Sequence, residues 1–187
     1  MEVFAQGKRG VVYREGNVCI KEKNPRSAVD TLANEAKYLQ LLNKKGIGPR
    51  FIKYSGGRLY RDFVDGVRIS DYFEQEAGKE KIISVVRQVL EQCRAMDLLG
   101  INKKELTNPY KDILVTADNK AVMIDFERCT GTKKPKNVTQ FLQYLARNKE
   151  VLEKKALYIN RAELIRLGKE YKEKGDEGNF KAIITTL

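Results

Sequence analysis

One stretch of the sequence, residues 103–128, constrains the fold more than any other, because it sets several acidic residues around a predicted β-hairpin. Two short apolar runs, 113–116 and 121–124, have the length and composition of paired strands. Asp118 and Asn119 lie between them, and both residue types tolerate the backbone angles of a tight turn. The sequence therefore predicts a hairpin closed by a two-residue turn.

The same turn predicts a pair of carboxylates at the open end of the hairpin. Counted from a two-residue turn, Asp112 lies directly opposite Asp125, with Cβ atoms about 4.5–5.5 Å apart. Like charges at that distance destabilise a strand pair, and a divalent cation between them relieves the repulsion. Mg²⁺ is usually held by one or two carboxylates together with substrate phosphates, so the pair suggests nucleotide chemistry. The alternative is two solvated strand ends, since a slip of one residue removes the pairing.

Length and charge allow one domain or two small lobes with an anionic partner. A chain of 187 residues can bury a sizeable core. Its formal net charge of +11 favours nucleotide phosphates, nucleic acid or an acidic protein as the partner. Histidine is absent, which excludes a histidine general base, a Ser/His/Asp triad and a histidine-ligated zinc site.

Cysteine usage and hydropathy favour a cytoplasmic protein. Cys19, Cys93 and Cys129 are far apart and predict neither a disulfide framework nor a metal-ligand cluster, so we expect reduced thiols. No apolar run reaches about 18 residues, and no basic and apolar leader opens the chain. We therefore expect no membrane-spanning segment.

The first 64 residues predict a five-stranded antiparallel sheet with one helix. The expected strands cover 2–5, 11–14, 18–22, 51–54 and 58–63. The helix is expected over 27–43, with Ser27 and Asp30 at its start as a variant of the capping box. After Val64 the pattern turns helical, which places the boundary between domains 1–64 and 65–187.

The second domain is predicted to be mainly helical. The expected helices cover 69–75, 79–99, 139–147, 149–157 and 161–174. The second of these is expected to be the spine of the domain, because its apolar residues recur at helical spacing. The last is expected to be capped by Asn160, with Glu163 at its third position.

Two features of the first domain suggest phosphate binding. The turn 6–10 carries two glycines and two bases, so backbone N–H groups and positive charge can lie over a phosphate. The alternative is a turn with no such role. Lys21 on the third strand is either solvated or packed behind the helix, where Glu35 offers it a partner.

Three motifs in this order resemble those of one known family. Residues 5–12 read AQGKRGVV, similar to G-x-G-x-x-G-x-V with alanine at the first glycine. Residues 18–21 read VCIK, similar to V-A-I-K, and residues 125–127 read DFE, similar to D-F-G. The set resembles the protein-kinase-like fold, in the minimal form of predicted archaeal serine/threonine kinases and RIO-type atypical kinases. That resemblance implies a two-lobed α+β fold.

The resemblance also implies ATP and Mg²⁺ as cofactors. The residues that it implies for nucleotide binding are Gly7, Lys8, Gly10, Val12, Lys21, Glu35, Asp62 and Val64. Among them Lys21 would bind the α and β phosphates with Glu35 as its ion-pair partner. Asp62 and Val64 would belong to the interlobe hinge, whose backbone groups face adenine. Asp125 would hold Mg²⁺.

The acidic stretch departs from the family pattern. Residues 103–106 read KKEL where H-R-D-L is expected, so Glu105 stands in place of the catalytic aspartate. Asp112 replaces the metal-binding asparagine. Glu127 replaces the D-F-G glycine, where it can hold a second cation or pair with Arg128. No A-P-E motif follows, so the peptide-docking platform is reduced.

The sequence as a whole predicts an ATP- and Mg²⁺-dependent phosphotransferase, an atypical serine/threonine protein kinase with a protein substrate. Glu105 would orient the acceptor hydroxyl, while Asp112 and Asp125 would hold the metal. Glu105 and Asp112 are seven residues apart rather than five, so Thr107 and Asn108 are alternatives for the first role. The alternative functions are a small-molecule kinase on the same fold, or a nucleotide-binding pseudokinase or ATPase that acts as a regulatory or RNA-associated module.

Overall fold

A computed structural model describes residues 2–76, 78–155, 157–158 and 160–187. It shows an α+β protein with a five-stranded antiparallel sheet and several helices. The chain divides into two compact units. The first unit comprises residues 1–65 and 122–129, and the second unit comprises residues 66–121 and 130–187.

The first unit is built on one antiparallel sheet with the strand order β1-β2-β3-β5-β4, which confirms the five predicted strands. The strands are β1 Glu2–Gln6, β2 Gly10–Glu15, β3 Val18–Lys23, β4 Phe51–Ser55 and β5 Arg58–Asp62. Gly56 and Gly57 join β4 to β5 with φ angles of 58° and 72°, and only glycine adopts two such angles in succession at little cost. In this strand order, β3 lies in the middle of the sheet.

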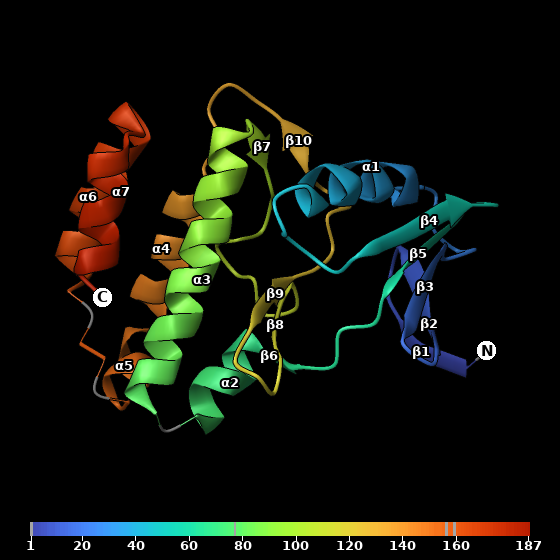
Figure 1. The fold of residues 1–187 in the computed structure, drawn as a ribbon, viewed down its shortest axis with the longest axis horizontal. Coiled ribbons are helices and arrows are strands. Elements are labelled where there is room, and N and C mark those ends of the chain that lie inside the picture. Colours follow the sequence, from blue (N-terminus) through green and yellow to red (C-terminus); the bar gives the residue numbers. More distant parts are fainter. Residues whose placement is uncertain (1, 77, 156, 159) are drawn as a thin grey trace. The chain divides into compact units, whose positions relative to one another are not determined.

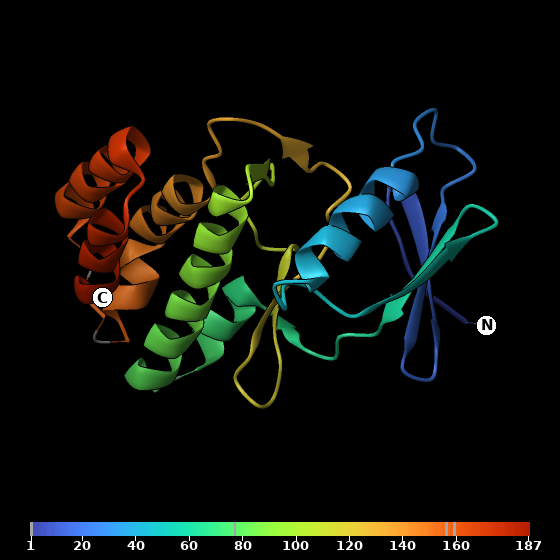
Figure 2. The ribbon, with the colours of Figure 1, turned by 45° about the horizontal axis from the view of Figure 1, so that its top comes forward.

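Helix α1, Leu32–Asn43, packs against β3, β4 and β5 on one face of this sheet (Figure 2). It begins five residues later than predicted. The Ser27 hydroxyl bonds to the backbone of Val29 instead of capping the helix, and Asp30 accepts the N–H of Leu32. Thr31 occupies the N-cap position without a capping hydrogen bond from its side chain.

The second unit is mainly helical. Its helices are α2 Ile69–Gln75, α3 Lys79–Leu98, α4 Asn137–Arg147, α5 Lys149–Glu153, α6 Arg161–Lys174 and α7 Glu177–Thr185. Helix α4 lies between α3 and α6, and α7 packs on α6 (Figure 1). The predicted apolar face of α3 is confirmed, because its members are all buried: Ile82, Ile83, Val86, Val89, Leu90, Cys93 and Met96. None of the helices in the described ranges combines the length and the apolar character needed to cross a bilayer.

Short strands complete the chain. Strands β6 Val67–Arg68, β8 Ile113–Val115 and β9 Ala121–Met123 form a sheet in the order β6-β8-β9. Strands β7 Ile101–Asn102 and β10 Thr130–Gly131 form an antiparallel pair.

The turn between β8 and β9 is one residue longer than predicted. The N–H of Thr116 donates to the carbonyl of Lys120 at 3.0 Å, which encloses three residues. Asn119 is the last of them, and its φ of 62° is the left-handed conformation that three-residue hairpin loops use there. The two-residue turn is therefore wrong, and the pairing of Asp112 with Asp125 counted from it does not follow.

The C-terminal helices match the prediction except at three points. Helix α4 begins at Asn137, two residues early. Helix α5 is shorter than the expected helix 149–157, whose later part includes Ala156, a residue outside the described ranges. Helix α7 was not predicted, although the side chain of Asp176 caps it. The predicted cap of α6 is confirmed, since the side chain of Asn160 accepts the N–H of Glu163 at 3.1 Å.

Candidate functional site

The first unit buries a lysine against a glutamate. Lys21 lies on the central strand β3, where it pairs with Val12 on β2 and Leu59 on β5. Glu35 lies on α1, the helix that packs against this strand. Lys21 Nζ is 2.6 Å from Glu35 Oε2, and only 8% and 1% of the two residues are exposed. The sequence left open whether Lys21 is solvated or packed behind the helix. The structure shows that Lys21 is packed there, with Glu35 as its partner.

Two further carboxylates surround the same ammonium group. Asp125 and Glu127 follow β9 in the segment 122–129 of the first unit. Lys21 Nζ lies 3.0 Å from Asp125 Oδ1 and 3.8 Å from Glu127 Oε2. Asp125 has a φ of 61°, a conformation that aspartate tolerates better than most residues, and 41% of its side chain is exposed. Its carboxylate therefore contacts the lysine and still reaches the surface of the first unit.

The charge of Lys21 is held firmly by these carboxylates. Burial alone lowers the pKa of Lys21, because it penalises the charged ammonium. The carboxylates of Glu35 and Asp125 outweigh burial and raise the pKa of Lys21 well above its ordinary value. The ammonium of Lys21 is therefore permanently charged and can contact an anionic ligand such as a phosphate, although the surrounding carboxylates make the cluster as a whole acidic.

Glu127 links three separate parts of the first unit. Its carboxylate accepts hydrogen bonds from Arg9 Nη1 and from the hydroxyl of Thr31, each at 2.8 Å. Thr31 is the N-cap residue of α1, and its hydroxyl donates to Glu127 instead of capping the helix. The side-chain amide of Asn34 donates to the carbonyls of Glu127 and Cys129 at 2.9 and 3.1 Å. These contacts tie the segment 122–129 to α1 and to the β1–β2 turn.

The β1–β2 turn is a compact structure held from outside. The N–H of Gly7 donates to the carbonyl of Gly10 at 2.8 Å. Asn24 supports the turn, because its side chain donates to the carbonyl of Gly7 at 2.7 Å and its N–H donates to that of Arg9 at 2.8 Å. A Cβ on Gly10 would lie 3.2 Å from Cε of Lys21 and 3.1 Å from the Glu22 carbonyl. Gly10 therefore allows the turn to approach the lysine closely.

The carboxylates form a donor set that fits a hard cation. Glu35, Asp125 and Glu127 each offer an oxygen, and these atoms lie within 4.8 Å of one another. Such oxygen donors suit Mg²⁺, which is commonly held by one or two carboxylates plus phosphate. Asp125, whose side chain is 41% exposed, is the most accessible of these ligands, while the oxygens of Glu127 already accept from Arg9 and Thr31 and would be shared with the metal. Residues and metal are therefore chemically compatible.

The remaining predicted residues of the first unit lie nearby or at its edge. Lys8 is exposed at the tip of the β1–β2 turn, and Val12 pairs with Lys21. Asp62 ends β5 and binds Arg50 through two hydrogen bonds of 3.0 and 2.9 Å. Val64 follows β5 in an irregular segment. The structure thus groups Lys21, Glu35 and Asp125 closely, and sets Asp62 further along the sheet.

Two predicted residues, Glu105 and Asp112, belong to the second unit. Glu105 is exposed in the turn before β8, and its φ of 79° is unusual for a residue with a side chain. Asp112 is buried, and its Oδ2 lies 3.3 Å from Nζ of Lys103, which is also buried. This pair gives Asp112 a cationic neighbour that the sequence analysis did not anticipate.

Sequence reasoning missed Asn24, Thr31 and Asn34 as supports of the site. All three are ordinary surface residue types in turns and at helix ends, so their composition carried no signal. Arg9 was part of the recognised turn, but its partner Glu127 was expected to bind a cation or Arg128. The carboxylate of Glu127 accepts from Arg9 and Thr31, while its binding of a second cation stays a prediction.

The sequence matches no protein-family model and no curated protein.

Proposed function

We propose that this protein is an ATP- and Mg²⁺-dependent phosphotransferase with a kinase-like, two-lobed arrangement, acting as a serine/threonine protein kinase. One observation carries the proposal. A buried lysine on the central strand lies 2.6 Å from a glutamate of the packed helix and 3.0 Å from an aspartate after β9. The kinase resemblance implies the same three partners, Lys21, Glu35 and Asp125.

Lys21 and the β1–β2 turn would bind the phosphates. Glu35 holds the ammonium of Lys21 in place, so little side-chain entropy remains to be lost when a phosphate arrives. Gly10 lets the turn approach that ammonium, and Arg9 supplies a second positive charge. The phosphates would therefore be placed by groups that are already ordered, which is how this class of enzyme achieves most of its rate enhancement.

Asp125 would hold the metal, with Glu127 beside it and Asp112 as the further ligand suggested by the sequence. Mg²⁺, when bound, neutralises charge on the transferred phosphate. The carboxylates otherwise repel the phosphates, so nucleotide binding should depend on the metal. Glu105 would orient the hydroxyl of the acceptor, a role that requires an accessible acid.

A nucleotide-binding protein without phosphoryl transfer is the second candidate. The observation that favours it is the contact of 3.3 Å between Lys103 and Asp112, because an ammonium at this carboxylate competes with a metal ion. Such a protein binds ATP through Lys21 but regulates a partner instead of modifying it.

The test combines phosphoryl transfer with thermal melts. We expect the protein with labelled ATP and Mg²⁺ to phosphorylate itself or a generic protein in preference to sugar, choline-like or aminoglycoside acceptors. Mg²⁺–ATP at 100 times its Kd should stabilise the fold by about 2.7 kcal/mol. Asp125→Asn should abolish both effects while keeping the backbone conformation, because asparagine also tolerates a positive φ.

Asp118→Asn, in the exposed turn between β8 and β9, is the matched control and should behave like the parent. An equal Mg²⁺–ATP shift in the parent and in Asp125→Asn would contradict the metal site. A shift without any phosphoryl transfer would favour the second candidate.

A further inference from the structure

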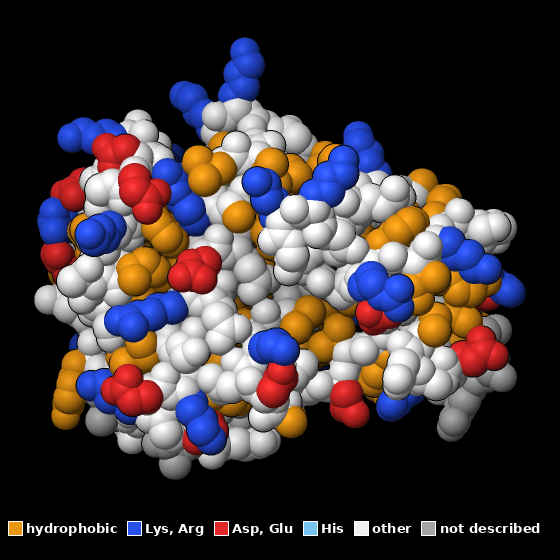
Figure 3. Space-filling view, viewed as in Figure 1, with side chains coloured by type: hydrophobic (Ala, Val, Ile, Leu, Met, Phe, Trp, Pro, Cys, Tyr) orange, Lys and Arg blue, Asp and Glu red, His pale blue; other side chains and the backbone are white. Residues whose placement is uncertain are grey.

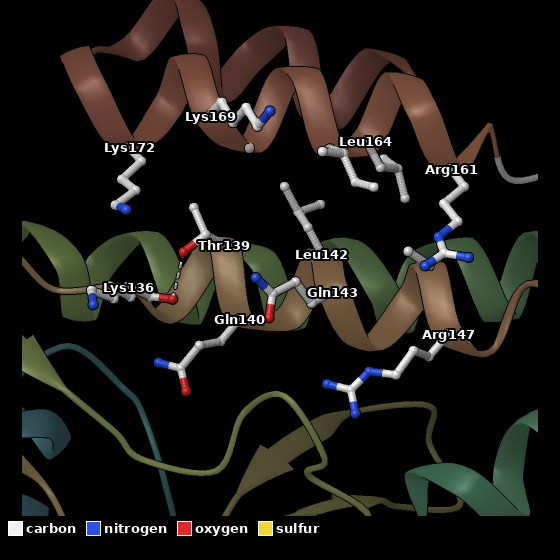
Figure 4. Close-up of a pocket in the computed structure, with 13 residues that line it drawn as sticks. Lys136, Thr139, Gln140, Leu142, Gln143, Arg147, Arg161, Leu164, Lys169 and Lys172 are labelled. Carbon is white, nitrogen blue, oxygen red and sulfur yellow. Dashed lines mark hydrogen bonds between the residues drawn. The ribbon is translucent and has the colours of Figure 1, made fainter.

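A basic groove runs between α4 and α6 in the second unit (Figure 4). Its volume is about 600 Å³. Leu142 of α4 and Leu164 of α6 form part of its floor, and the two helices approach closely where Gly168 faces Leu142. Within the described ranges, no acidic residue lines the groove, whereas five lysines and arginines do: Lys136, Arg147, Arg161, Lys169 and Lys172.

Helix α4, with its N-cap residue Lys136, presents a row of polar residues to this groove. On α4 the residues Lys136, Gln140, Gln143 and Arg147 follow one another at intervals of four, three and four. Such spacing places side chains on one face of a helix. In this row, therefore, cations stand at the two ends and amides stand in the middle.

Helix α6 also places cations at both ends of the groove. Figure 4 shows Lys172 near Lys136 at one end of the groove and Arg161 near Arg147 at the other. Gathering like charges in this way costs free energy unless an anion neutralises them. The arrangement therefore fits a ligand with negative charges at both ends of the groove.

These cations have no acidic partner among the residues that the structure describes. Among the acids of α6, Glu163 and Glu170 bind Arg166, whereas Glu173 lines a neighbouring hollow together with Lys169 and Lys172. The face of the molecule in Figure 3 is different, because basic and acidic side chains are interspersed there. The groove is thus a site where positive charge is left available.

The basic surface continues past the start of α4. A second hollow, of about 900 Å³, shares Lys136, Lys169 and Lys172 with the groove. Its other charged lining residues within the described ranges are four bases and two acids: Arg94, Lys133, Lys134, Lys174, Asp97 and Glu173. The segment 133–136 is anchored, because the buried side chain of Asn137 donates to Asp97 Oδ1 at 2.7 Å and to the carbonyl of Ile101 at 2.6 Å. The backbone at the start of α4, next to Lys136, is therefore fixed in place.

We propose that this groove binds single-stranded RNA through its phosphate backbone. From Lys136 to Arg147 the groove is about 16 Å long, at 1.5 Å of rise per residue. A stacked strand carries one phosphate about every 3.4 Å, so about five phosphates span this length. The terminal cations bind phosphates, while Gln143 offers a donor and an acceptor to ribose 2′-hydroxyls and base edges. Gln140 offers its carbonyl oxygen, because its Nε2 already donates to Asn102 Oδ1 at 3.4 Å and to the carbonyl of Lys103 at 3.3 Å.

RNA fits these groups better than an acidic peptide does. In an extended peptide the side chains on one face recur about every 6.6–6.8 Å, so a strand with a phosphate about every 3.4 Å brings about twice as many charges to the cations of the groove. Among the described residues that line the groove, none has an aromatic side chain on which a base can stack. Binding is therefore tolerant of sequence, and its affinity comes mainly from displaced counterions.

The test measures binding of a labelled 20-nucleotide, unstructured RNA to the full chain by fluorescence anisotropy across a salt series. The slope of log Kobs against log[salt] should be about −0.7 for each phosphate contact. The double variant Arg147→Glu/Lys169→Glu should bind at least tenfold more weakly near 100 mM salt and reduce the slope by about 1.4. Both residues are exposed, so thermal melts should show an intact fold.

The matched control is Lys44→Glu/Lys45→Glu, which makes the same change in net charge at exposed positions of the first unit. It should bind RNA within about twofold of the parent. An equal loss in both double variants would overturn the groove assignment in favour of a general charge effect.

Two competitors test the identity of the ligand. Single-stranded DNA of the same sequence should bind severalfold more weakly, and Gln140→Ala/Gln143→Ala should remove that preference. DNA that binds as tightly as RNA, or polyglutamate of equal charge that displaces RNA as well as unlabelled RNA does, would overturn the proposal. None of these readouts depends on ATP, so they are separate from the proposed phosphotransferase.

Discussion

Lys21 Nζ lies 2.6 Å from Glu35 Oε2 in the interior of the first unit. A buried ion pair contributes little net stability when formed, because both charges lose their hydration. Breaking it is much more costly, since the remaining partner is left as an uncompensated buried charge. The pair therefore makes the first unit dependent on Lys21 for stability as well as for the proposed phosphate binding.

We expect Lys21→Met to destabilise the protein by about 3–5 kcal/mol, because it leaves Glu35 buried without its closest cation. Urea unfolding measures this loss. The double variant Lys21→Met/Glu35→Leu should recover much of the stability while still failing to bind ATP. Lys120→Met removes a lysine from the exposed ion pair with Asp118 and should leave the unfolding midpoint unchanged. A Lys21→Met variant as stable as the parent would show that Glu35 does not need the pair.

Glu127 should make nucleotide binding dependent on metal. Its charge, added to those of Glu35 and Asp125, outweighs the charges of Lys21 and Arg9. We expect Glu127→Gln to bind ATP severalfold more tightly in EDTA, because it removes one repelling charge while keeping an oxygen for Thr31. Calorimetric titrations with EDTA and with Mg²⁺ measure the difference. Glu15→Gln, an exposed acid at the far end of β2, is the control. Unchanged affinity in EDTA would contradict this electrostatic account.

Two variants of Glu105 separate the chemical role of its carboxylate from the strain of its backbone. Its φ of 79° favours glycine, so Glu105→Gly relieves the backbone strain and removes the side chain together with its contacts. Glu105→Gln keeps the strain and removes the acid. If Glu105 orients the acceptor, both variants should lose phosphoryl transfer by about 10²–10⁴ and retain ATP affinity. Transfer rates and thermal melts of the two variants decide between the roles, and full activity in either variant would remove Glu105 from the mechanism.

The buried hydroxyl of Tyr144 should make the stability of the protein depend on pH in the alkaline range. Burial, with smaller effects of Asp71 and Glu74, raises the pKa of Tyr144 to about 12 from an ordinary value of 10.0. Below pH 10 both folded and unfolded chains keep the proton, so stability does not depend on this group. Between about pH 10 and 12 the unfolded chain ionises first, and stability falls as pH rises.

Tyr144→Phe should therefore make the alkaline loss of stability shallower, as measured by melts from pH 7 to 12. Within the described ranges the hydroxyl of Tyr144 is buried without a hydrogen-bond partner, while its ring stacks on Phe73 and Phe141. We thus also expect a gain of about 1 kcal/mol at pH 7. Tyr158→Phe, at a residue that is 78% exposed, should change neither quantity. A steeper alkaline loss in Tyr144→Phe would contradict the assignment.

Local sequence patterns determined most of the secondary structure. The strands of the first sheet, the apolar face of α3 and the cap of α6 by Asn160 all depend on residues a few positions apart. Alternation, helical spacing and capping are properties of neighbours in the chain, so they can be read without knowing the fold. The pairing of Lys21 with Glu35 was also accessible, because a strand lysine behind an apolar helix face requires a nearby carboxylate.

The tertiary structure decided which side chains meet when they are far apart in the chain. Arg9 and Glu127 are separated by 118 positions, and no local pattern relates them. Thr31 is the N-cap residue of α1, and its hydroxyl donates to Glu127. The start of the helix therefore involves a residue from a distant segment. The turn before β9 gained a residue because Asn119 adopts a left-handed conformation, one of several that its sequence allows. The basic groove arises only when α4 and α6 pack together. Each helix then supplies cations to one side of the groove, so that both sides of the groove are basic.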